Sequence, residues 1–223
     1  MISNKMQTLV ANSSTIRAMF EEGKRLAAIH GAENVYDYSL GNPNVLPPDT
    51  IKKAIMEILD SENSNVIHGY MNNSGYEDVR TEIANFINKK QSLKLDASSI
   101  VMTCGAAGGL NIILKALLNP EDEVIVFAPF FGEYRNYVSN FDGKLIVVPA
   151  DTTHFEPNIA ALKEALTSRT KAVIINSPNN PTGVIYSEEA IKHLAATLEE
   201  AEKAFGTSIY LISDEPYREI VYD

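Results

Sequence analysis

Five short apolar segments, separated by helical patterns, constrain the fold of this chain more than any other feature. Each is rich in β-branched residues and apolar on both faces, which is typical of strands buried inside a parallel sheet. From about residue 99 onward the chain therefore alternates strand and helix. We predict an α/β fold in which helices flank a mainly parallel sheet. The predicted strands are residues 100–103, 124–128, 145–148, 172–176 and 209–213, and the predicted helices between them are residues 110–118, 132–138, 159–166 and 188–204.

Upstream of this alternation the sequence predicts helices and loops. Amphipathic spacing predicts one helix over residues 14–30, a second that follows Asp49 and a third around residues 79–87. Glycine, asparagine and proline between the first two helices indicate a loop. We expect residues 1–45 to form an N-terminal arm and helix. Residues 46–223 are expected to form the remainder of the fold.

Charge and composition argue against several classes of partner. The net charge of −10 argues against binding to nucleic acid or to an anionic membrane. No apolar run approaches the ~20 residues that a membrane-spanning helix needs. The four histidines lack metal-ligand spacing, so we expect no metal site. Cys104 is the single cysteine, so an intramolecular disulfide is excluded, and this fits a reducing cytoplasm. We interpret Cys104 as a buried packing residue.

A glycine- and alanine-rich motif at residues 104–109 follows the first predicted strand and opens a helix. Small residues let the backbone approach a phosphate, and the first N–H groups of a helix present the positive end of its dipole to an anion. The same residues would equally suit close packing of the helix against its neighbours. The motif is not a Walker loop, because no Gly-Lys-Ser/Thr follows, and it lacks the Gly-x-Gly-x-x-Gly spacing of dinucleotide-binding folds.

Two further motifs follow the second and fourth predicted strands. Phe131, in Pro-Phe-Phe, offers an aromatic face for stacking on a flat ligand, although an ordinary core phenylalanine would explain it as well. Asn180, in Asn-Pro-Thr-Gly, has an amide that can donate to a phenolate oxygen. Asn-Pro and Thr-Gly are also common turn chemistry, so a plain turn is the alternative.

Asp214 ends the last predicted strand, and a carboxylate at the end of an apolar strand is costly unless it is paired. A pyridinium N–H would pair it, and the carboxylate would keep that nitrogen protonated. The ring would then act as an electron sink for a carbanion at a substrate's α-carbon. A helix cap or a structural ion pair would also satisfy Asp214. Tyr217, three residues later, suits a second hydrogen bond to the phenolate or is a half-buried surface tyrosine.

Together these motifs resemble those of fold-type-I pyridoxal-phosphate enzymes, specifically class I/II aminotransferases of the aspartate/aromatic kind. The resemblance runs from about residue 12 to residue 223, and the order and separation of the motifs are more specific than any one of them. It implies a cytoplasmic, homodimeric enzyme that binds pyridoxal 5'-phosphate and moves an amino group between an amino acid and a 2-oxo acid. The resemblance also implies that residues 1–45 are an N-terminal arm and helix belonging to a small domain, and that residues 46–223 are the pyridoxal-phosphate-binding large domain, truncated at its C-terminus.

The resemblance also implies a role for each matching residue. Asp214 would bind the pyridine nitrogen, and Gly41 would lie near the substrate carboxylate. Tyr70 would reach the phosphate of the cofactor bound by the neighbouring subunit, which implies the homodimer. The remaining cofactor contacts would be Gly105, Ala106 and Ala107 to the phosphate, Phe131 to the ring face, and Asn180 and Tyr217 to the phenolic oxygen.

The sequence departs from the family's pattern at its end. The lysine that forms a Schiff base with the cofactor normally lies well beyond the Asp-x-x-Tyr motif, and this chain ends at Asp223. We therefore expect the N-terminal part of an aminotransferase, with no catalytic residue of its own and inactive alone. The family also inserts its last strands between the first strand and the rest, so this chain would leave a gap in its sheet. The alternatives are a lyase, decarboxylase or synthase of the same fold, or a non-catalytic module of that fold.

Overall fold

The computed structural model of this protein describes residues 2–12, 14–36, 45–61 and 63–222. It forms two compact units, Met1–Tyr70 and Met71–Asp223. The predicted domain boundary after residue 45 stays a prediction.

The N-terminal unit consists of helices that bury no side chain among those described. The predicted helix over residues 14–30 is confirmed as α2. On α3 (Asp49–Ser61), Ile51, Ile55 and Ile58 repeat at helical spacing, yet each remains about half exposed. The helices of this unit are α1 (Asn4–Asn12), α2 (Ser14–His30), η1 (Ala32–Asn34), α3 (Asp49–Ser61) and α4 (Ser64–His68).

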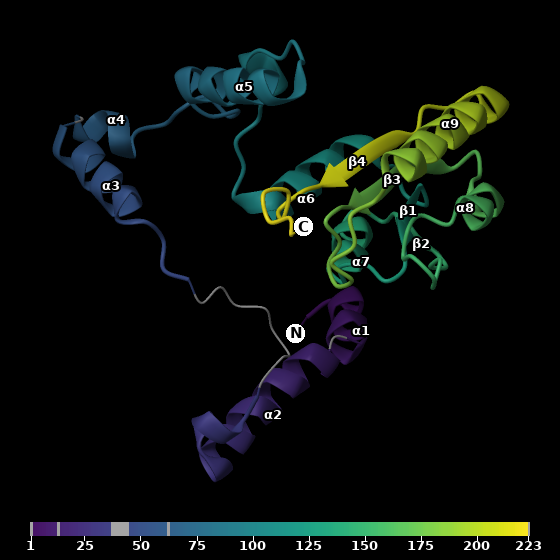
Figure 1. Cartoon of the computed structure of the whole chain (residues 1–223), viewed down its shortest axis with the longest axis horizontal. Helices are drawn as coiled ribbons and strands as arrows, with labels where there is room; N and C mark the ends of the chain where they lie inside the picture. Colours follow the sequence, from purple (N-terminus) through teal and green to yellow (C-terminus); the bar gives the residue numbers. More distant parts are fainter. Residues whose placement is uncertain (1, 13, 37–44, 62, 223) are drawn as a thin grey trace. The chain divides into compact units, whose positions relative to one another are not determined.

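The second unit is built on a four-stranded sheet in the order β2-β1-β3-β4, with every neighbouring pair parallel (Figure 1). The strands are β1 (Glu123–Phe127), β2 (Lys144–Val148), β3 (Thr170–Asn176) and β4 (Tyr210–Asp214). The helices of this unit are α5 (Glu77–Gln91), η2 (Ala97–Ser99), α6 (Gly105–Leu117), α7 (Tyr134–Ser139), α8 (Ile159–Ala165) and α9 (Glu188–Phe205). The predicted parallel α/β architecture is therefore confirmed.

Each face of the sheet carries its own apolar core, because alternate strand residues point to opposite faces. On one face, Val124, Val126 and Ile174 pack with residues of α6 and α7. On the other face, Ile125 and Val173 pack with residues of α8 and α9. Full burial of one such side chain stabilises the fold by about 1.5–3 kcal/mol. Helices on both faces explain why these strands are apolar on both sides.

The first predicted strand, residues 100–103, is wrong, because the segment is not part of the sheet. Its Met102 N–H donates instead to the carbonyl oxygen of Ser74, 2.9 Å away in a turn. A β-branched segment becomes a strand only where another strand pairs with it, and among the described residues β4 pairs with β3 alone. Cys104, which follows this unpaired segment, is exposed and not buried as expected.

Candidate functional site

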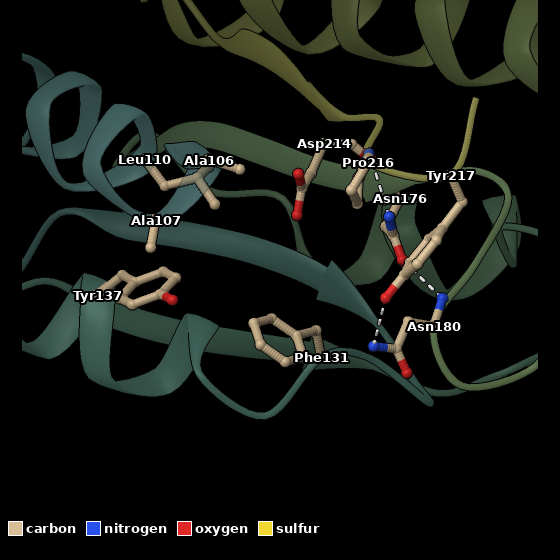
Figure 2. A pocket seen from close by; sticks show the side chains of 10 residues that line it. All are labelled: Ala106, Ala107, Leu110, Phe131, Tyr137, Asn176, Asn180, Asp214, Pro216 and Tyr217. Carbon is tan, nitrogen blue, oxygen red and sulfur yellow. Dashed lines mark hydrogen bonds between the residues drawn. The ribbon is translucent and has the colours of Figure 1, made fainter. Parts of the chain in front are cut away.

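A pocket lies at the carboxyl ends of the strands, where ligands of open α/β sheets bind (Figure 2). Its lining comes from the start of α6, the loop after β1, α7, the end of β3 and the turn after β4. The lining residues are Ala106, Ala107, Leu110, Phe131, Tyr137, Asn176, Asn180, Asp214, Pro216 and Tyr217. The structure therefore brings six of the predicted cofactor-binding residues into one pocket.

The first turn of α6 contributes the backbone at one end of this pocket. Gly105 begins the helix with a φ of 74°, a conformation that favours glycine. Its N–H donates to the carbonyl oxygen of Thr103 at 2.9 Å, and it does not line the pocket. Ala106 and Ala107 do line it, and N–H groups in a helix's first turn have no intrahelical acceptor. Gly105 thus shapes the turn, while the two alanines present the helix N-terminus.

Asp214 is paired with a neutral phenol. The hydroxyl of Tyr134 donates to the Oδ2 atom of Asp214 at 2.6 Å. Tyr134 is 1% exposed, and its ring packs edge-on against Phe131 with centroids 5.6 Å apart. Burial, followed by the hydrogen bond to the Asp214 carboxylate, raises the pKa of Tyr134 far above its usual range. The phenol therefore stays protonated and serves as a permanent donor to this carboxylate.

Three polar side chains join the ends of β3 and β4 on the other side of the pocket (Figure 2). The Asn176 side-chain amide donates to the carbonyl oxygen of Asp214 at 2.7 Å. Its Oδ1 atom accepts from the backbone N–H of Asn180 at 2.6 Å. The Asn180 amide in turn donates to the Tyr217 hydroxyl at 3.3 Å. The amide and the hydroxyl are thus held next to each other at the pocket.

Sequence reasoning missed three polar residues of this site: Tyr134, Tyr137 and Asn176. Tyr137 lines the pocket from α7, and burial raises the pKa of its phenol. For Tyr134 the signal was indirect: Asp214 needed a partner, but the sequence did not single out this tyrosine, which lies near the start of the helix predicted over residues 132–138. The signal for Asn176 was a polar residue closing an otherwise apolar strand.

The structure does not test the predicted roles of two further site residues. Gly41 lies outside the described residues. Tyr70 is fully exposed and belongs to the N-terminal unit, whereas every lining residue belongs to the second unit. Their roles stay predictions.

The described part of the chain contains no metal-binding cluster, no membrane-spanning helix and no lysine in the pocket lining. No cluster of three or more His, Cys, Asp or Glu residues that could hold a metal ion occurs there. No described helix is both long and apolar enough to cross a membrane. None of the described residues that line the pocket is a lysine.

Comparison with known proteins gives consistent matches to aminotransferases. The model of the family described as "Aminotransferase class I and II" matches residues 32–223. A solved aminotransferase from Eubacterium rectale is 44% identical with a TM-score of 0.95, and the match covers 100% of this chain and 56% of that chain. A probable N-acetyl-LL-diaminopimelate aminotransferase of Bacillus subtilis is 32% identical, over 86% of this chain and 46% of that protein. An aspartate aminotransferase of Pyrococcus horikoshii is 28% identical, over 97% and 52% respectively. The chain spans about half the length of the curated relatives it matches.

Proposed function

The chain belongs to the class I and II aminotransferases, and we propose that it is the cofactor-binding N-terminal part of such an enzyme. The family uses pyridoxal phosphate. The complete enzyme would move an amino group between an amino acid and a 2-oxo acid. The observation that carries the proposal is the pocket in which Asp214, the Asn180–Tyr217 pair and the first turn of α6 meet.

The donors and acceptors of this pocket fit the functional groups of pyridoxal phosphate. The backbone at Ala106 and Ala107 suits the phosphate, because a helix N-terminus attracts anions. The Asn180 amide and the Tyr217 hydroxyl suit the phenolic oxygen. The Asp214 carboxylate suits the ring nitrogen, because it favours the protonated form.

When bound, pyridoxal phosphate supplies the electron sink that stabilises negative charge at a substrate's α-carbon. The residues of this chain bind and orient it. Asp214 would hold a proton on the ring nitrogen, and Tyr134 fixes the Asp214 carboxylate through its hydroxyl. Phe131, 37% exposed beside the pocket, offers a ring face for stacking.

We further propose that this chain alone does not catalyse transamination. The absence of a lysine from the described pocket lining supports this, because the reaction needs a lysine as nucleophile and proton carrier. Gly41 at the substrate carboxylate, Tyr70 at a neighbouring subunit's cofactor, and a cytoplasmic homodimer remain parts of the proposal. The division into a small domain over residues 1–45 and a large domain over residues 46–223 also belongs to it.

Titration of the purified chain with pyridoxal phosphate, with and without borohydride reduction, tests this proposal. We expect saturable binding that Asp214→Ala weakens, and no specific lysine labelled after reduction. Absence of saturable binding would refute the assignment of the pocket. Stoichiometric labelling of one lysine would refute the proposed inactivity, because the chain would then hold its own Schiff-base residue.

A further inference from the structure

Asn176 uses both ends of a buried side-chain amide to join two parts of the pocket. It is the last residue of β3, and the residue is 4% exposed. One end donates to the Asp214 carbonyl oxygen, and the other accepts from the Asn180 N–H. Figure 2 shows this amide between the turn that carries Asn180 and the end of β4.

The position of Asn176 in the sheet explains why these two bonds matter. Asn176 and Asp214 are the last register partners of the β3–β4 ladder. Beyond them no ladder bond holds the two strands together, and the chain leaves β3 for the turn that contains Asn180. The Asn176 amide therefore links the end of β4 to the turn after β3, beyond the last backbone pair of the ladder. An amide that lost a partner here would leave a buried polar group unsatisfied, which is unfavourable, so both hydrogen bonds are retained.

We infer that Asn176 is a positioning residue that sets the distance between Asp214, which would bind the ring nitrogen, and Asn180, which would bind the phenolic oxygen. The inference rests on the proposed function. The nitrogen and the phenolic oxygen belong to one rigid ring, so their separation is fixed. Asp214 and Asn180 can both meet that ring only if the protein fixes their spacing to match. A single planar amide bonded to the backbone of both residues fixes it.

Two analogues of pyridoxal phosphate separate this role from general support of the fold. One has carbon in place of the ring nitrogen, and the other lacks the phenolic hydroxyl. Equilibrium dialysis gives the affinity of the full chain for the cofactor and for each analogue. In the wild-type chain we expect each analogue to bind about tenfold or more weakly than the cofactor, the size of one lost hydrogen bond that involves a charged group.

Asn176→Ala removes both bonds of the amide. We expect both affinity ratios, each analogue against the cofactor, to fall toward one. A merely structural role would weaken all three ligands by the same factor and leave the ratios unchanged, which would overturn the inference. Thr197→Val, at a buried polar residue of α9 outside the pocket, is the matched control and should leave the ratios unchanged.

Asn176→Asp is the near-isosteric variant and carries the test if Asn176→Ala fails to fold by circular dichroism. It keeps the oxygen that accepts from Asn180 but loses the donor to the Asp214 carbonyl. We expect this variant to bind the analogue without the ring nitrogen about as tightly as the cofactor. It should still bind the analogue without the phenolic hydroxyl more weakly than the cofactor. The added negative charge would favour a pyridinium and so opposes the expected loss. Unchanged discrimination at both positions would overturn the inference. Equal affinities of the wild-type chain for all three ligands would instead refute the proposed function, and the inference with it.

Discussion

The two units of this chain both contain amphipathic helices, but among the described residues only the sheet unit buries their apolar faces. Ile55 on α3 and Leu114 on α6 are comparable apolar residues at helical spacing. Ile55 is 54% exposed, whereas Leu114 is 0% exposed. The difference arises because the sheet offers α6 an apolar face to pack on, and no described residue of the N-terminal unit is buried in this way. Hydrophobic periodicity therefore specifies a helix and its apolar face, while a core also requires a partner surface.

Truncating one apolar side chain in each unit tests this contrast most strongly. Leu114→Ala should lower the free energy of unfolding by about 2–5 kcal/mol, because it leaves a cavity in a closed core. Ile55→Ala should change it by less than about 0.5 kcal/mol, because the residue is already half solvated. Urea unfolding followed by circular dichroism measures both. Equal costs would show that α3 has a buried environment in solution.

Within the sheet unit, the hydrogen bond between Tyr134 and Asp214 should also stabilise the fold. Tyr134→Phe removes the donor to the Asp214 carboxylate and should cost about 1.5–3 kcal/mol, the range for hydrogen bonds to charged groups. Tyr186→Phe is the control, because Tyr186 is also buried but its hydroxyl is bonded to the neutral Asn179. The control should cost about 1 kcal/mol. A Tyr134→Phe cost no larger than that of the control would contradict the charged-partner account.

The same pair predicts a loss of stability at alkaline pH. The pKa of Tyr134 in the folded chain lies above its ordinary value of 10.0. Above pH 10 the unfolded chain therefore releases a proton that the folded chain keeps. Stability contributed by this phenol is complete below pH 10 and falls as pH rises, by about 1.4 kcal/mol per pH unit. Between pH 9 and pH 11, the urea midpoint of Tyr134→Phe should fall less steeply with pH than that of the wild-type chain. Equal slopes would show that other groups cause the alkaline loss of stability.

Gly105 and Gly132 allow the cost of backbone strain to be measured separately from the cost of a steric clash. Gly105 has a φ of 74°, whereas Gly132 is outside the left-handed region, and an added Cβ would contact nothing within 4 Å at either position. Gly105→Ala should cost about 1–2 kcal/mol from backbone strain alone. Gly132→Ala should be close to neutral. Thermal unfolding of the two variants measures the difference, and equal melting temperatures would argue against the positive φ at Gly105.

The sequence predicted the sheet because β1 to β4 carry their own signal. Their residues are β-branched and apolar on both faces, and each strand has a partner within the chain. Residues 100–103 carry the same composition but have no such partner among the described residues, so composition alone was not sufficient. The need for a partner at Asp214 was predictable from burial chemistry. Its identity as Tyr134 was not, because the two residues are 80 positions apart in the chain.

Nitrogen NMR of isotope-labelled pyridoxal phosphate bound to this chain tests the central claim most directly. The chemical shift of the ring nitrogen reports whether it is protonated. We predict a protonated nitrogen in the wild-type complex at a pH where the free cofactor has lost this proton, because the Asp214 carboxylate stabilises the pyridinium. Asp214→Asn, which keeps the shape and removes the charge, should give the unprotonated shift. Identical shifts in the two complexes would contradict the assignment of Asp214 and of the pocket built around it.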